Sequence, residues 1–209
     1  MRAIARRGRG ETDATQGHTL LDEAQDVVAL IESIEQPVFL LGHSYGAQCS
    51  LAAAAQLPHR VRKLILYEPP SPELLSPANL QRLEALASRG AWDEFTFRFF
   101  NETLLVPESD LEQLRASELW DPTVGDAKAS LGDLQALSRY NFSPARFQAL
   151  TCPVLLQVGS ESPPALYVTK ALEKVLPNVT IETLAGQAHE GMTTAPEMYA
   201  ESVSRFLLT

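Results

Sequence analysis

Apolar residues along the chain follow two alternating patterns, one typical of amphipathic helices and one typical of buried strands. Between Thr19 and Glu35 they recur about every 3.6 residues, which predicts a helix. The next segment, Val38–Leu41, is a short unbroken apolar run, as expected for a strand buried on both faces of a parallel sheet. Residues 47–57, nearly all small or apolar, predict a buried helix, and Val61–Tyr67 predicts a second strand.

This alternation is interrupted in the middle of the chain. Residues 71–150 show short helical patterns broken by glycine and proline, without convincing strands. Strands and helices then resume, and we expect them at Val154–Val158, at about 165–176, at Val179–Leu184 and at about 195–208. The pattern predicts an α/β fold in which residues 1–70 and 151–209 form a parallel sheet with its helices, and residues 71–150 form an inserted helical cap. Near the N-terminus, Ala3–Ala5 is expected to be a short strand that runs into an Arg/Gly loop.

Composition narrows the class of protein. The 209 residues are 45% hydrophobic and 21% charged, which is typical of a globular chain, and they contain no run of about 18 apolar residues that would span a membrane. The net charge of −9 disfavours binding to nucleic acid or to an anionic lipid surface. The cysteines, Cys49 and Cys152, lie far apart and outside any zinc-binding pattern, which indicates a reducing compartment, the cytoplasm, and no metal site.

Gly42-His43-Ser44-Tyr45-Gly46 matches the pattern G-x-S-x-G and lies between a predicted buried strand and a predicted buried helix. This context is typical of a nucleophile elbow, in which a serine is held on a sharp strand-to-helix turn. Because the helix and the strand approach each other closely there, we expect glycine at positions 42 and 46 for steric reasons. Ser44 is therefore a candidate nucleophile.

A nucleophilic serine needs a neighbouring imidazole that is oriented by a carboxylate. His189 follows the last predicted strand in the loop Gly186–Gly191, and such loops at the carboxyl ends of parallel strands are where α/β sheets bind ligands. His18 and His59 are expected at the surface, and His43 is expected to support the structure of the elbow. His189 is therefore the candidate base.

Over nearly its whole length the chain resembles the cap-bearing members of the α/β-hydrolase superfamily. The elbow and the loop GQAHEGM carry the resemblance, and three further segments fit the alignment, namely RRGRGE (6–11), LILYEPP (64–70) and PVLLQVGSESP (153–163). The resemblance implies that Ser44 is the nucleophile, that His189 is the general base and acid, and that the backbone N–H of Tyr45 donates to the oxyanion.

The third member of the triad is the first departure from this family. Most members carry an aspartate three positions after the glycine that ends strand seven, and here that position, counted from Gly159, is Ser162. Glu161 is one residue away, and a shift of one residue along an extended segment turns the side chain to the other face. Glu68, at the end of the strand before the Pro69-Pro70 pair, is our preferred acid, with Glu161 as the alternative.

The second departure is at the N-terminus. Nothing in the sequence matches strands one to three of the family or the HG loop that supplies the other oxyanion donor. We therefore expect an N-terminally truncated member with an incomplete sheet.

These residues predict a serine hydrolase that attacks an ester-type carbonyl and passes through an acyl-enzyme, without metal or organic cofactor. The aromatic residues of the 71–150 region are expected mainly to form the core of the cap, and the alternative, an apolar pocket under the cap, would favour small apolar substrates. Other chemistries on the same triad remain open, namely hydrolysis of a C–C bond, lactone opening and perhydrolysis, as does a non-catalytic binding domain or an inactive fragment.

Overall fold

A four-stranded parallel sheet forms the centre of the fold in the computed structural model, which describes residues 2–13 and 17–208. All neighbouring strands are parallel, and their order in the sheet is their order in the sequence. The strands are β1 (Val38–His43), β2 (Val61–Tyr67), β3 (Val154–Gly159) and β4 (Val179–Leu184). Each begins at the residue where the sequence predicts a strand, so the α/β architecture expected from the sequence is confirmed.

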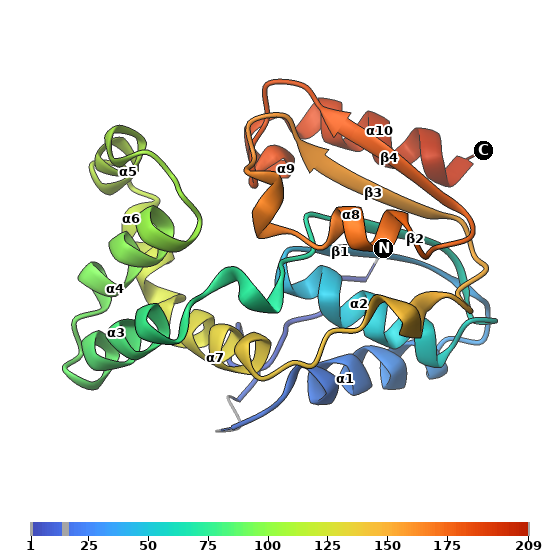
Figure 1. Cartoon of the computed structure of the whole chain (residues 1–209), viewed down its shortest axis with the longest axis horizontal. Coiled ribbons are helices and arrows are strands. Elements are labelled where there is room, and N and C mark those ends of the chain that lie inside the picture. Colours follow the sequence, from blue (N-terminus) through green and yellow to red (C-terminus); the bar gives the residue numbers. More distant parts are fainter. Residues whose placement is uncertain (1, 14–16, 209) are drawn as a thin grey trace. The chain divides into compact units, whose positions relative to one another are not determined.

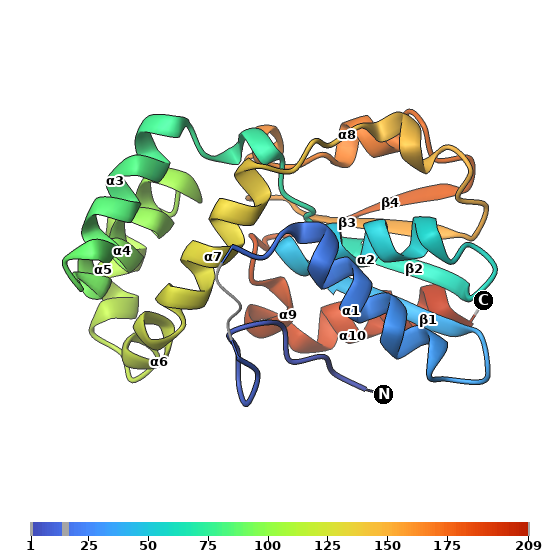
Figure 2. The same cartoon turned by 90° about the horizontal axis from the view of Figure 1, so that it is seen from below.

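Helices cover both faces of this sheet (Figures 1 and 2). One face carries α1 (Leu20–Glu32), α2 (Tyr45–Gln56) and α8 (Thr169–Glu173), and the other carries α10 (Pro196–Leu208), which follows the short α9 (Gly191–Thr194). Successive side chains of β2 point to opposite faces of the sheet, which explains the two helical layers. Leu64 and Leu66 pack on one face in the apolar cluster with α1 and α2. Lys63 points to the other face, where its ammonium donates to the carbonyl of Phe206 in α10 at 2.7 Å.

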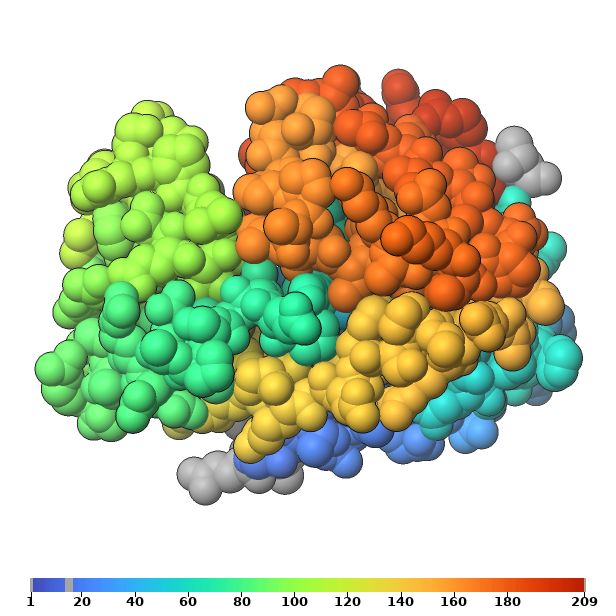
Figure 3. Space-filling view, in the orientation of Figure 1, coloured from blue at the N-terminus to red at the C-terminus, as the bar shows by residue number. Residues whose placement is uncertain are grey.

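The helix expected at about 165–176 is shorter in the structure. Pro164–Leu166 form a single 3-10 turn, and α8 starts only at Thr169. Between them, Tyr167 makes an antiparallel bridge with Pro70, just beyond the end of β2. A backbone that bonds to another segment in extended form cannot continue a helix, so this pairing overrides the local helical pattern. Figure 3 shows in orange the surface that α8, the segment leading to it and the edge strand β4 form on this side of the sheet unit.

The chain divides into two compact units. The sheet unit comprises Leu20–Ser71 and the chain from Asn141 onward, and the helical unit comprises Pro72–Tyr140 with the N-terminal segment up to Thr19. The helices of the helical unit are α3 (Pro77–Ser88), α4 (Trp92–Arg98), α5 (Glu108–Arg115), α6 (Trp120–Gly125) and α7 (Ala127–Ser138), with a π-helical turn at Phe99–Thr103. Across the described residues, no helix combines the length and the apolar character needed to cross a membrane.

The N-terminal segment differs from the sequence-based expectation. Residues 3–5 are not part of a strand, and the segment clusters with the helical unit instead of with the sheet. Two arginines explain this placement. The guanidinium of Arg6 donates to both carboxylate oxygens of Asp133 in α7, at 2.7 and 2.6 Å, and that of Arg9 donates to one of them at 3.0 Å.

The aromatic side chains of the helical unit mostly serve as its core. Phe95 is fully buried in a cluster with leucines of α3 and α7, and Trp92 and Phe99 pack against that cluster. Trp120 is 5% exposed, and its indole N–H donates to a carboxylate oxygen of Asp93 at 2.7 Å.

Candidate active site

Ser44 occupies a strained turn between β1 and α2. Its φ of 53° and ψ of −129° lie in a region that residues with a side chain rarely adopt. The backbone N–H of Ser44 donates to the carbonyl of Tyr67 at 2.9 Å, which fixes the turn against the end of β2. Strain of this kind persists only where the surroundings impose it, and it concentrates at functional sites.

The two glycines of the elbow differ in what surrounds them. A Cβ atom on Gly42 would lie 2.5 Å from the carbonyl oxygen of Gly46 and 2.6 Å from Ser50 Oγ, so no larger residue fits. A Cβ atom on Gly46 would meet nothing within 4 Å among the residues that the structure describes. The expected steric need for glycine therefore holds at position 42, whereas Gly46 lies in the first turn of α2 on an open side.

His189 lies in the loop between β4 and α9, next to the end of β2. Its Nδ1 is 2.6 Å from Oε2 of Glu68, and its side chain is 15% exposed. Because a carboxylate only accepts hydrogen bonds, Nδ1 carries the proton, and the neutral ring leaves Nε2 as the basic nitrogen. Glu68 therefore selects the tautomer that a general base requires.

Glu68 directly follows β2 and is completely buried, with a φ of 48°. Its second oxygen, Oε1, accepts the backbone N–H of Gly159 at 2.7 Å, and its own N–H donates to the carbonyl of Gln157. Burial alone would raise the pKa of the Glu68 carboxyl, but hydrogen bonds with His189 and the N–H of Gly159, together with the nearby hydroxyl of Ser162, outweigh it and lower this pKa. Glu68 is accordingly charged at neutral pH.

The alternative acid is placed differently. Glu161 is exposed, and its carboxylate accepts a hydrogen bond from the hydroxyl of its neighbour Ser160 at 2.8 Å. Ser162 is buried at 7% exposure, close enough to Glu68 to affect its pKa. Of the two glutamates singled out in the sequence, the structure thus brings Glu68, and not Glu161, to the imidazole of His189.

Gly159 permits the close approach to β3 of the loop that carries His189 (Gly186–Gly191, the histidine loop). A Cβ atom there would lie 2.3 Å from the carbonyl oxygen of Gln187. The same carbonyl accepts the N–H of Glu161 at 2.9 Å, so the loop is bonded to the chain just past β3. The carboxyl ends of β1, β2 and β3 therefore converge on His189, as expected for a site on a parallel sheet.

Ser44 and His189 come from neighbouring segments, but no hydrogen bond joins Ser44 Oγ to the imidazole within residues 2–13 and 17–208. Such contacts are often long in enzymes without substrate and tighten when substrate binds. Tyr45, the first residue of α2, places its backbone N–H at the positive end of that helix.

Two tyrosines contact the site although the sequence analysis did not single them out. The hydroxyl of Tyr167 lies 3.2 Å from Nδ1 of His189, and its ring stacks on the imidazole with centroids 5.6 Å apart. Tyr67 contacts the backbone of the histidine loop through its hydroxyl. The position of Tyr67, next to the candidate acid Glu68 at the end of a predicted strand, could have indicated that it lies near the site. Nothing in the sequence indicates this for Tyr167.

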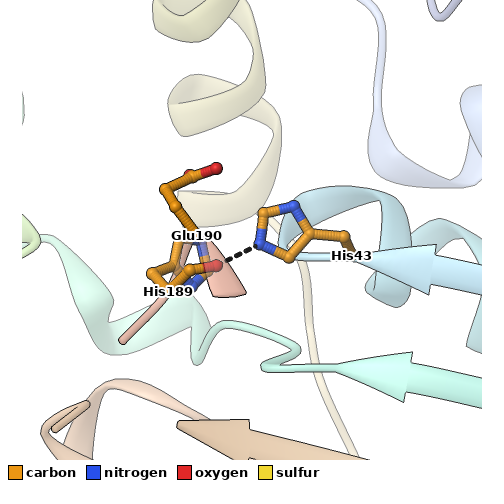
Figure 4. Close-up of side chains that lie close together, drawn as sticks. All are labelled: His43, His189 and Glu190. Atoms are coloured by element: carbon orange, nitrogen blue, oxygen red, sulfur yellow. Dashed lines mark hydrogen bonds between the residues drawn. The ribbon is translucent and has the colours of Figure 1, made fainter. Parts of the chain in front are cut away.

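His43, His189 and Glu190 each place one atom of a metal-ligating type within 4.8 Å of the others (Figure 4). Nε2 of His43 donates to the carbonyl oxygen of His189 at 2.8 Å, in keeping with the supporting role expected for this residue. Nδ1 of His189 is already bound to Glu68, so a metal ion would have to take Nε2, the unprotonated nitrogen of this tautomer. The arrangement thus suits proton transfer at Nε2.

Comparison with known proteins agrees with this geometry. A sequence model of the alpha/beta hydrolase family matches residues 2–202. A 2-(acetamidomethylene)succinate hydrolase from Mesorhizobium japonicum is 26% identical over 98% of this chain and 77% of its own length.

Solved structures show the same fold. An alpha/beta hydrolase from Sphaerobacter thermophilus superposes with a TM-score of 0.79 at 27% identity, over 97% of this chain and 79% of that one. A thermophilic esterase from Thermogutta terrifontis superposes with a TM-score of 0.71 at 24% identity, over 97% of this chain and 77% of that one.

Proposed function

Since the chain belongs to the alpha/beta hydrolase family, we propose that it is a serine hydrolase that cleaves an ester-type carbonyl compound through an acyl-enzyme. The observation that carries the proposal is the contact of 2.6 Å between Glu68 Oε2 and His189 Nδ1, beside a serine on a strained elbow. A buried, charged carboxylate on a histidine at the edge of a sheet is the arrangement that activates a serine hydroxyl.

In the proposed reaction Ser44 Oγ attacks the carbonyl carbon while its proton passes to Nε2 of His189. Glu68 stabilises the imidazolium that forms, and the N–H of Tyr45, at the N-terminus of α2, stabilises the oxyanion. His189 then returns the proton to the leaving alcohol, and Ser44 keeps the acyl group. A water molecule, deprotonated by His189, releases the acid and regenerates the serine.

We further propose small apolar ester-like molecules as substrates, because Phe97 and Phe100 in the 71–150 region are only partly buried and keep some apolar surface outside the core of the helical unit. We also propose that the protein works in the cytoplasm, because Cys49 and Cys152 are both buried free thiols, as expected in a reducing compartment.

The nucleophile is tested by replacing Ser44 with alanine. The wild-type chain should hydrolyse short p-nitrophenyl esters and be labelled by a fluorophosphonate probe, since that probe bonds covalently to an activated serine. The Ser44→Ala variant should lose both reactions, because it lacks the oxygen that forms the acyl-enzyme in the proposed reaction. Ser50→Ala, one and a half turns along α2, is the control and should keep its labelling. Labelling of the Ser44→Ala variant at the wild-type rate would contradict the assignment.

A further inference from the structure

Tyr67 contacts both the elbow that carries Ser44 and the loop that carries His189. It is the last residue of β2, it is completely buried, and in the sheet it pairs with His43, the residue before Ser44. Its carbonyl accepts the N–H of Ser44 at 2.9 Å. The backbone of Tyr67 thus fixes the elbow, and its side chain extends from there to the histidine loop.

The hydroxyl of Tyr67 holds that loop on both sides of His189. It donates to the carbonyl oxygen of Ala188, and it accepts the backbone N–H of Gly191 at 3.3 Å. A phenol has one proton to donate and lone pairs to accept, so both capacities are used. Burial, with the nearby charge of Glu68, raises the pKa of Tyr67, and the hydroxyl therefore keeps its proton over the working range of pH.

The ring of Tyr67 is itself held between neighbours. Its centroid lies 5.3 Å from that of His43 and 5.7 Å from that of Tyr199, on which it stacks. A tyrosine fixed in this way has few torsional degrees of freedom left, so its hydroxyl is a rigid reference point for the loop.

Gly191 fits closely against this hydroxyl. A Cβ atom at position 191 would lie 2.6 Å from the oxygen of Tyr67 and 3.3 Å from the Cβ of Gln187. Any side chain there would have to displace either the tyrosine or the loop, so the two residues are expected to act as a pair.

We propose that the Tyr67 hydroxyl is a positioning group that sets where His189 lies relative to Ser44, by fixing the backbone of the histidine loop. This inference rests on the proposed function, because it gives the contact a role in the same reaction. Its physical basis is that proton transfer requires the serine oxygen and Nε2 within hydrogen-bonding reach. Tyr67 does not touch the reacting atoms and acts only through the loop.

The test is Tyr67→Phe, which removes the hydroxyl and keeps the ring. Steady-state kinetics on a p-nitrophenyl ester should show kcat per titrated active site falling about 10- to 100-fold, with KM nearly unchanged, since a small misplacement of a catalytic group costs this much. Normalising to titrated sites removes any loss of folded protein, so a purely structural role would leave this value unchanged. Tyr199→Phe is the matched control, because the described residues offer its hydroxyl no hydrogen bond, and it should keep the wild-type kcat.

Two further variants address the same contact from the side of the loop, and the first of them, Gly191→Ala, covers the case in which Tyr67→Phe folds poorly. Gly191→Ala alone should lower kcat, and the added methyl should cost less in Tyr67→Phe/Gly191→Ala, where the oxygen it meets is gone. If Tyr67→Phe keeps the wild-type kcat per site, or if Gly191→Ala does so where Tyr67→Phe cannot be purified, the proposal is wrong. Failure of the proposed function would look different, because the wild-type chain itself would then not be labelled by the fluorophosphonate.

Discussion

Two residues of the site, Ser44 and Glu68, have strained backbone conformations, and Glu68 also carries a buried charge. Ser44 and Glu68 both have a positive φ, at 53° and 48°, and each is fixed by a backbone hydrogen bond to the end of a neighbouring strand. Such conformations cost about 1–3 kcal/mol each, and the surrounding sheet must supply that free energy. The two strained residues carry the oxygen atoms that the proposed reaction needs.

The identity of the acid is tested at this scale. Glu68→Gln should lower kcat/KM about 10²- to 10⁴-fold, because an amide brings no negative charge and does not enforce the tautomer with the proton on Nδ1. Adding Ser162→Asp to that variant should restore part of the rate, since Ser162 is buried beside Glu68. The measurement is ester hydrolysis per titrated site. Glu161→Gln is the control, and an unchanged rate in Glu68→Gln would exclude Glu68 as the acid.

The sequence allowed Ser44, Glu68 and His189 to be singled out because each stands next to a predicted element boundary. It left Glu68 and Glu161 as alternatives, because the choice depends on which carboxylate reaches a histidine more than 20 residues further along the chain. The contacts of Tyr167 could not be predicted at all. They depend on its bridge to Pro70, which exists only in the folded sheet.

At the scale of elements, the start of every strand was predicted correctly. The two inner strands, β2 and β3, are buried almost throughout, as their continuous apolar runs imply. The expectation that Val38–Leu41 is buried on both faces was wrong, because Phe39 and Leu41 of β1 are 44% and 43% exposed. Helix boundaries were less well predicted where tertiary pairing competes, as between residues 164 and 168. The sequence pattern also does not show which glycines lie at a close approach between two elements. The elbow motif has glycine at positions 42 and 46, but only the first is enclosed by neighbouring atoms.

This difference predicts opposite effects of alanine at the two positions. Gly42→Ala should destabilise the fold by about 1–3 kcal/mol or more, because its methyl would overlap the backbone of α2. Gly46→Ala has open space in a helix and should be neutral or stabilising by up to about 1 kcal/mol. Urea unfolding followed by circular dichroism measures both. Equal losses of stability in the two variants would show that the elbow does not have this packing.

For the whole molecule, the division into a sheet unit and a helical unit follows from the order of elements along the chain. The strands predicted from the sequence stop after Tyr67 and resume at Val154. The chain passes from the sheet unit to the helical unit at Pro72 and returns at Asn141, between these strands. The membership of the N-terminal segment was not predictable from pattern. It depends on an ion pair between Arg6 and Asp133, which are separated by 127 positions.

The ion pairs of Asp133 lead to a prediction about the helical unit. Asp133 is 7% exposed and accepts from two arginines, whereas Asp126 pairs with Arg9 from an exposed position. Asp133→Asn should destabilise the helical unit by about 1–3 kcal/mol, between the values typical of exposed and of buried pairs, because it removes the negative charge that Arg6 and Arg9 share. Asp126→Asn, the control, should cost less than about 1 kcal/mol.

The two tryptophans make this measurement specific to one unit. Trp92 and Trp120 are the only tryptophans of the chain, and both belong to the helical unit. Urea unfolding followed by their fluorescence therefore reports that unit, while circular dichroism reports helices of both. For Asp133→Asn the fluorescence midpoint should shift to lower urea. A midpoint equal to that of Asp126→Asn would mean that the arginines do not stabilise the unit through Asp133, and that the N-terminal segment is held by other contacts.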